Sequence, residues 1–99
     1  MAIQDSQLKA DTISRLADEV LPALARADSE DYPVRFDHCF RRIAYDYAVG
    51  QKWDEVIESP FYKNASGAQL RRAVQALETM IRQPEKADEL NEQSLSYRT

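Results

Sequence analysis

The sequence has few of the residues that support disulfides, zinc sites or tight turns. Its 99 residues include one cysteine, Cys39, and one histidine, His38. Neither an intramolecular disulfide nor a zinc site built from cysteine and histidine is therefore expected, and we predict no metal ligands and no cofactor. Only two glycines and four prolines are present, which disfavours a β-sandwich with many tight turns and excludes a low-complexity chain.

Long hydrophobic runs are also missing. No apolar run approaches the roughly 20 residues that span a bilayer, and no basic-then-apolar signal pattern stands at the N-terminus. A single thiol without such a signal is typical of a protein in the reducing cytoplasm. The sequence therefore predicts a cytoplasmic chain with no membrane partner.

The charge balance is mildly acidic. Lysine and arginine total 13 against 17 for aspartate and glutamate, which gives a net charge of −4. This balance does not favour a protein that binds nucleic acid through its overall charge, but it does not exclude a local basic patch. We expect residues 1–99 to form a single helical domain, with fraying confined to residues 1–5 and 95–99.

Apolar residues recur at helical spacing along most of the chain. The pattern predicts helices over residues 5–27 (kinked at Pro22), 34–49, 52–58, 67–82 and 84–94. Ser66 and Gln69 have the spacing of a capping box, and Gly50 suits the position just past a helix end. Because no segment alternates like a strand, the predicted fold class is all-α, a compact bundle of four to five helices.

The helix predicted over residues 34–49 has two distinct faces. One face contains Phe36, Phe40, Ile43 and Tyr47 and is expected to point into the core. The opposite face carries His38, Arg41, Arg42, Tyr45 and Val49, with Trp53 beyond the helix end. Because arginine and tyrosine are enriched at binding hot spots, this second face is a candidate surface for a protein partner.

The same face has two structural interpretations. It could be a solvated face in which Arg41 pairs with Asp37 and Arg42 pairs with Asp46, each four residues apart. Alternatively, the helix could be central in the bundle, with Tyr45 and Val49 covered by another helix.

A second arginine pair, Arg71 and Arg72, stands near the start of the helix over residues 67–82, where a cation opposes the helix dipole. Together with Arg41 and Arg42 it would bind phosphate or nucleic acid if two helices presented one patch. Arg72 could instead hold an acidic loop such as residues 28–31, and all four arginines could be independent surface charges.

No catalytic residue is assigned. His38 and Cys39 are adjacent, and adjacent helical side chains diverge by about 100°, which argues against a thiol–imidazole pair. A small enzyme using His38 with Asp46 or another carboxylate is the third functional hypothesis. The first is a non-enzymatic protein-interaction module (a subunit, adaptor or inhibitor), and the second is a phosphate or nucleic-acid binder. The partner's identity and homo-oligomerisation stay open.

Two segments, residues 38–46 (HCFRRIAYD) and 90–98 (LNEQSLSYR), resemble a group of short bacterial helical proteins, some of which carry an acetyltransferase label. The resemblance covers residues 34–98 and rests on His38, Arg42, Ile43, Asp46, Asn91, Ser94 and Arg98. An acetyl-coenzyme A transferase of the usual kind is a mixed α/β fold with a pyrophosphate-binding turn. This sequence shows neither a strand pattern nor such a turn. No established function is carried over. The resemblance implies only that Asp46, Arg42 and the segment Asn91–Arg98 belong together.

Overall fold

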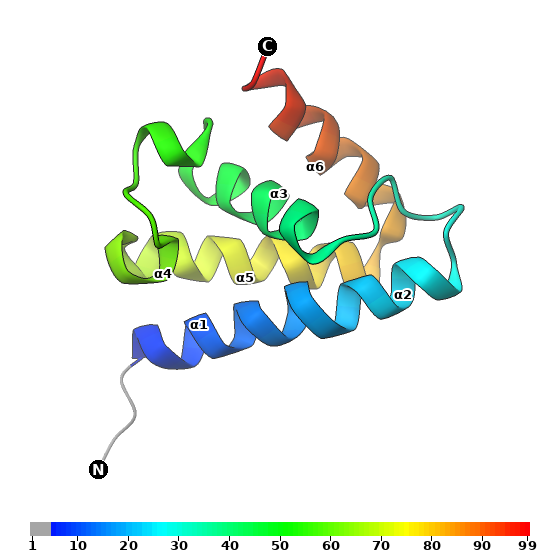
Figure 1. Cartoon of the computed structure of the whole chain (residues 1–99), viewed down its shortest axis with the longest axis horizontal. Helices are drawn as coiled ribbons and strands as arrows, with labels where there is room; N and C mark the ends of the chain where they lie inside the picture. The colour runs from blue at the N-terminus through cyan, green and yellow to red at the C-terminus, as the bar shows by residue number, and fades with distance from the viewer. Residues whose placement is uncertain (1–4) are drawn as a thin grey trace.

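The computed structural model describes residues 5–99, with side chains from Leu8 onward, and these residues form helices and no strand (Figure 1). The elements are α1 (Asp5–Arg15), the π-helical segment η1 (Leu16–Val20), α2 (Leu21–Ala27), α3 (Asp37–Val49), the 3-10 turn η2 (Trp53–Glu55), α4 (Phe61–Asn64), α5 (Gly67–Arg82) and α6 (Pro84–Ser96). The predicted all-α bundle is confirmed. Of the residues predicted to fray, 1–4 lie outside the described part of the chain. Fraying is not seen at Asp5, which begins α1, or at the C-terminal end, where α6 runs to Ser96 and Arg98 is bonded to Asp46.

The first three elements form one long rod, which crosses the bottom of Figure 1. Pro22 does not end the rod: it is in the first turn of α2, which directly follows the π-helical segment. In a regular α-helix the proline ring would crowd the carbonyl of Asp18, four residues earlier. The wider π turn is one of the recognised ways in which a helix absorbs such a disturbance. The rod thereby keeps one apolar stripe buried: Ile13, Leu16, Ala17 and Leu21.

Helix α3 lies at the centre of the bundle, packed against α5, α6 and the η1 part of the rod (Figure 1). It begins at Asp37, later than the predicted start at residue 34, because Phe36 has an extended backbone at the cap position. Helical spacing therefore does not apply to Phe36, and its side chain is 64% exposed. The prediction that Phe36 faces the core is wrong. The helix ends at Gly50 in the left-handed conformation, with a φ of 84°, as predicted.

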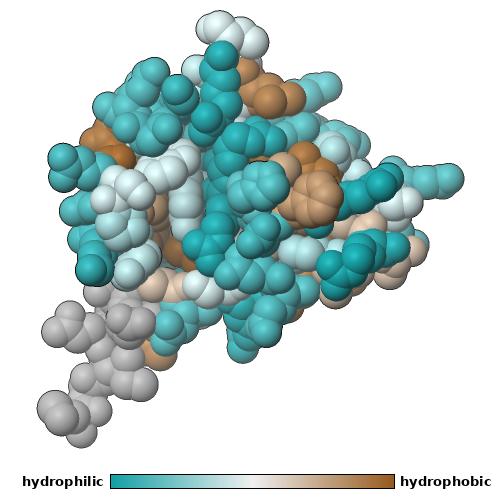
Figure 2. All heavy atoms as spheres, viewed as in Figure 1, coloured by the Kyte–Doolittle hydropathy of each residue, from teal (hydrophilic) through white to brown (hydrophobic). Residues whose placement is uncertain are grey.

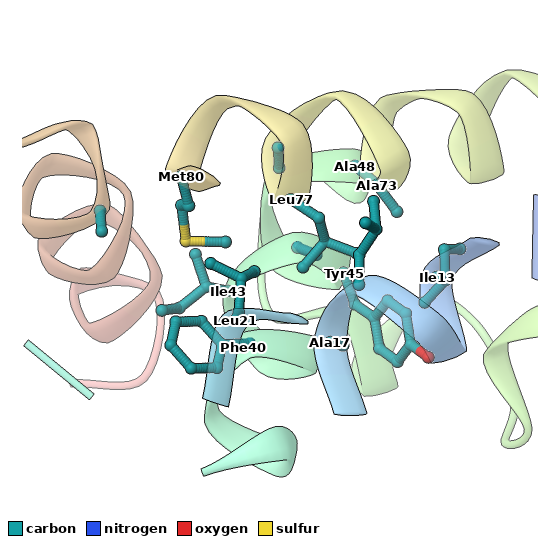
Figure 3. Close-up of a cluster of buried hydrophobic side chains, with 14 of the residues drawn as sticks. Ile13, Ala17, Leu21, Phe40, Ile43, Tyr45, Ala48, Ala73, Leu77 and Met80 are labelled. Atoms are coloured by element: carbon teal, nitrogen blue, oxygen red, sulfur yellow. The ribbon is translucent and has the colours of Figure 1, made fainter. Parts of the chain in front are cut away.

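Helix α5 contributes an apolar face to the core, with five buried residues: Leu70, Ala73, Ala76, Leu77 and Met80. Its bounds match the prediction, and its first turn is closed by the predicted capping box. The Gln69 backbone N–H donates to the Ser66 hydroxyl at 3.1 Å, and the Ser66 N–H donates to Gln69 Oε1 at 2.8 Å. Figure 3 shows Leu77 and Met80 of α5 among side chains from α3 and the rod.

The two connections that flank α3 differ from the loop and the helix that were predicted for them. The acidic connector after α2 is anchored by Tyr32, which is buried and donates from its hydroxyl to the Met80 carbonyl at 3.0 Å. The helix predicted over residues 52–58 is only the short turn η2. Of its predicted buried stripe, Trp53 and Ile57 pack partly against the core, but Val56 is exposed. A 3-10 turn has three residues per turn, so it cannot hold the predicted α-helical stripe in register.

The exposed large hydrophobic side chains among the described residues are scattered over different elements. They are Leu8, Phe36, Val56, Tyr62 and Leu95. Figure 2 accordingly shows a largely hydrophilic face with separate small hydrophobic areas. No helix in the described part of the chain is long and apolar enough to cross a membrane.

Leu77 tests the core. Replacing it with alanine (Leu77→Ala) should lower the free energy of unfolding by about 2–5 kcal/mol, because the side chain is fully buried and its loss leaves a cavity. Chemical denaturation measures the change. The control Leu95→Ala, at an exposed leucine of α6, should leave the midpoint almost unchanged. Equal midpoints for the two variants would contradict this placement of the core.

Candidate functional site

The predicted contact face of α3 does not form one exposed surface. Arg42 and Asp46 point toward α6, whereas Arg41 and Tyr45 point toward the rod. Tyr45 is 7% exposed, so the interpretation of α3 as a central, covered helix is confirmed for this residue. The two sides of α3 therefore have to be considered separately.

On the α6 side, the carboxylate of Asp46 is completely buried and accepts four hydrogen bonds. Arg98 donates from Nη2 to Oδ1 at 3.0 Å and from Nε to Oδ2 at 3.1 Å. The Trp53 backbone N–H donates to Oδ1 at 3.0 Å, and the Ser94 hydroxyl donates to Oδ2 at 2.5 Å. A buried carboxylate is tolerated only when it is paired and hydrogen-bonded in this way. Asp46 thus ties α3 to α6 and to η2.

Arg42 extends the same network. It donates from Nη1 to the Ser94 hydroxyl at 2.7 Å and from Nη2 to Asn91 Oδ1 at 2.8 Å. The predicted direct pair between Arg42 and Asp46 is wrong, because Ser94 lies between them and is bonded to both. The implied association of Arg42 and Asp46 with the segment Asn91–Arg98 is confirmed. We call these five side chains, Arg42, Asp46, Asn91, Ser94 and Arg98, the α6 clamp.

On the rod side, Arg41 forms a bidentate ion pair with Asp18 of the π-helical segment. Its Nε donates to Oδ1 at 2.8 Å and its Nη2 donates to Oδ2 at 2.5 Å. The predicted pair of Arg41 with Asp37 is therefore wrong. Asp18 raises the pKa of Arg41 further above its usual value through this hydrogen bond. Arg41 also donates to the Tyr45 hydroxyl and to the Ser14 hydroxyl, each at 3.4 Å.

Beside Arg41 is a hollow of about 530 Å³ between α1, α3 and α4. Its lining residues are Ala10, Asp11, Ile13, Ser14, Arg41, Tyr45, Tyr62 and Lys63. Ala10 and Ile13 are buried and form an apolar floor, whereas Ser14, Tyr62 and Lys63 are exposed at the rim. We call this feature the α1–α4 hollow.

Tyr45 is held rigidly at the edge of the hollow. Its ring stacks on Phe61 with centroids 4.0 Å apart and meets Trp53 edge to face at 5.2 Å. In Figure 3 the hydroxyl is at the end of the ring that points away from Phe40 and Met80. Burial raises the pKa of Tyr45 above the usual value of a tyrosine, while Arg41 opposes part of that change. The phenol therefore keeps its proton at neutral pH and remains a hydrogen-bond donor.

The remaining predicted partner-binding residues have different environments. Val49 and Trp53 are half-buried against the core. His38 is 77% exposed, its ring stacks on Phe36, and its Nδ1 is 3.6 Å from an Asp37 carboxylate oxygen. The α1–α4 hollow thus brings together two of the six predicted residues, Arg41 and Tyr45, and adds residues that sequence reasoning missed.

Arg72 stabilises the end of α3. Its Nε donates to the Ala48 carbonyl and its Nη2 donates to the Tyr47 carbonyl, both at 3.2 Å, and its guanidinium lies 4.9 Å from the Tyr47 ring centroid. A cation is favourable at the carbonyl end of a helix. This contact explains an arginine near the start of α5. Of the alternatives weighed for Arg72, the acidic loop over residues 28–31 is not its partner.

The four arginines of the phosphate hypothesis are engaged in different places. Arg41 pairs with the rod, Arg42 with α6 and Arg72 with the end of α3, while Arg71 is exposed. Presenting them to one ligand would require several of these contacts to break. In the described part of the chain, no group of three histidine, cysteine, aspartate or glutamate side chains is placed to hold a metal ion.

No protein family, curated protein or solved structure matches this chain. Function therefore has to be inferred from the geometry of the α6 clamp and the α1–α4 hollow.

The α6 clamp can be tested at Asp46. The variant Asp46→Asn should lower the free energy of unfolding by about 3–5 kcal/mol, because it leaves Arg98 without its charge partner and sets an amide N–H₂ against existing donors. Chemical denaturation measures the loss. The control Asp88→Asn makes the same change at an exposed position of α6 and should cost little. Equal stability of the two variants would show that the clamp does not hold α6.

The cap on α3 can be tested at Arg72. The variant Arg72→Ala should lower the free energy of unfolding by about 1 kcal/mol, since it removes two hydrogen bonds and a favourable charge from a partly solvated helix end. The matched control is Arg71→Ala, one residue away on an exposed site. Thermal melts of both variants separate the contact from a general effect of lost positive charge. A larger loss for Arg71→Ala would contradict the assignment.

Proposed function

We propose that this protein is a small, non-enzymatic helical module of the cytoplasm that binds another protein, as a subunit, adaptor or inhibitor, through the α1–α4 hollow. The observation that carries the proposal is that Arg41 and Tyr45, two residues of the candidate contact face, line a concave site with an apolar floor and a polar rim. Buried aromatic and arginine groups around a pocket are the usual features of interface hot spots.

The hollow is also well ordered for binding. Asp18 fixes the Arg41 guanidinium with two hydrogen bonds, and ring stacking on Phe61 fixes Tyr45. A partner would not have to immobilise these side chains, and that saving in conformational entropy increases affinity. By contrast, Arg42 is already used by the α6 clamp, so it contributes to the binding surface only indirectly, by holding α3 in place.

The two rival functions have less support. A phosphate or nucleic-acid binder would use Arg41, Arg42, Arg71 and Arg72, but three of these are bonded to different parts of the chain. A small enzyme centred on His38 would need a concave site around the imidazole, and that side chain is largely exposed beside Phe36. Neither arrangement offers a geometry comparable with the hollow.

The rim residue Tyr62 provides the test. The full chain is used to capture partners from cells of its source organism, and the dissociation constant of each purified candidate is measured. The variant Tyr62→Ala should weaken a true partner by about tenfold or more, because it removes an aromatic contact from the rim.

The matched control is Leu95→Ala, because Leu95 is exposed to almost the same extent (46% against 45%) but lies on α6, away from the hollow. Both variants should melt at the parent temperature. A partner whose affinity is unaffected by Tyr62→Ala and by further substitutions around the hollow would contradict the proposed contact site.

A further inference from the structure

Helix α6 is attached to the bundle more by polar bonds than by apolar contacts. Only Ala87 and Ser94 of its 13 residues are buried, whereas α5 buries five residues. A single residue with a non-helical backbone, Gln83, separates α6 from α5 (Figure 1). An element with so few buried apolar contacts opens at a lower free energy than the core, and an isolated helix of this length is only marginally stable in water.

The bonds of the α6 clamp meet at one carboxylate. The guanidinium of Arg98 forks across Asp46, with one nitrogen donating to each oxygen, and so fixes the plane of the carboxylate. In that orientation Oδ1 also accepts the Trp53 backbone N–H at 3.0 Å, which joins the clamp to η2. If Arg98 and Ser94 leave with α6, the carboxylate of Asp46 is open to water and free to rotate. The bond to Trp53 therefore depends on the docking of α6.

Trp53 extends this dependence to the other side of α3. Its ring meets Tyr45 edge to face with centroids 5.2 Å apart, and it meets Phe61 in the same way at 5.7 Å. The rings of Tyr45 and Phe61 are stacked on each other, and Tyr45 forms part of the wall of the α1–α4 hollow. The Tyr45 wall is thus connected to the α6 clamp through Trp53.

We propose that α6 and the residues after it form a latch with two states. In the docked state the latch holds the carboxylate of Asp46, which holds Trp53 and thereby orders the Tyr45 wall of the hollow. In the undocked state α6 separates from the bundle at Gln83, and Asp46 becomes solvated. Because such coupling is reciprocal, a molecule that prefers the ordered wall favours the docked latch. This device goes beyond the proposed function and does not require that a partner bind at the hollow.

Backbone amide hydrogen exchange of the full chain, followed by NMR, tests the latch in the unaltered protein. The amides of Leu90 and Ser94 in α6 should exchange with a smaller free energy of opening than those of Leu77 and Met80 in α5, because they require only the latch to open. The Trp53 amide should be no better protected than the α6 amides, because its acceptor is released in the same event. Equal protection of α6 and the buried part of α5 would show that α6 does not open separately, and would overturn the inference.

The variant Arg98→Met tests the coupling, because it keeps the aliphatic stem but leaves Asp46 without its charge partner. The exchange rates of the α6 amides and of the Trp53 amide should rise by the same factor, about tenfold or more, as expected for the loss of charged hydrogen bonds. The ring signals of Tyr45 and Phe61 should shift, because both rings lie close to the indole of Trp53.

Matched controls separate these effects from a general loss of charge or of a hydroxyl. Arg71→Met removes an exposed arginine from α5 and should change none of these signals. If Arg98→Met does not fold, the milder variant Ser94→Ala replaces it, since it removes the hydroxyl that donates to Asp46 and should have the same effects at smaller size. Its control is Ser96→Ala, whose exposed hydroxyl bonds only within α6.

Three further outcomes would overturn the inference. Faster exchange in α6 without a matching change at the Trp53 amide would show that the latch and η2 are not coupled. Unchanged ring signals of Tyr45 would show that the wall of the hollow does not sense the latch, and unchanged α6 exchange in the clamp variant would show that the clamp does not hold it. None of these results bears on whether a partner binds at the hollow, which the Tyr62→Ala test decides separately.

Discussion

The buried carboxylate of Asp46 is the constraint on which the arrangement of the C-terminal half depends. A charge in that position is costly unless all its hydrogen-bond acceptor sites are used. Meeting that requirement brings together the backbone of Trp53 in η2 with the hydroxyl of Ser94 and the guanidinium of Arg98, which both belong to the C-terminal segment. Helix α6 has only two buried residues, Ala87 and Ser94. The polar bonds of the α6 clamp therefore fix the position of α6 on α3, which so small an apolar face does not define.

The position of α3 determines what the other side of the molecule presents. Once α6 occupies the Arg42 side, the Arg41 side turns toward the rod, where the π-helical segment places Asp18 within reach. The irregular turn before Pro22 therefore has a consequence beyond accommodating the proline. It supplies the carboxylate that orients Arg41 at the α1–α4 hollow, while the rings of Trp53 and Phe61 hold Tyr45 in place. The packing of the core thus positions both Arg41 and Tyr45 at the proposed binding site.

The candidate site was only partly accessible to sequence reasoning. Helical spacing correctly placed Arg41 and Tyr45 on a different face from Phe40 and Ile43, but it could not indicate which element would cover them. Ser14 and Lys63 carried no signal, because they lie on other helices and approach α3 only through the tertiary packing. The segment of residues 90–98 gave a useful hint through its resemblance to helical proteins, since the predicted association with Asp46 and Arg42 is present in the structure.

The amino-acid sequence by itself determined the all-α class, the bounds of α5, the capping box at Ser66 and the left-handed end at Gly50. These features depend on contacts between residues a few positions apart, which periodicity and capping rules describe. The tertiary structure alone decided the partners of the arginines. Arg41 reaches 23 residues back to Asp18, and Arg42 reaches 52 residues forward to Ser94. Long flexible side chains bond to whichever helix the core packing brings alongside, and no local rule contains that information.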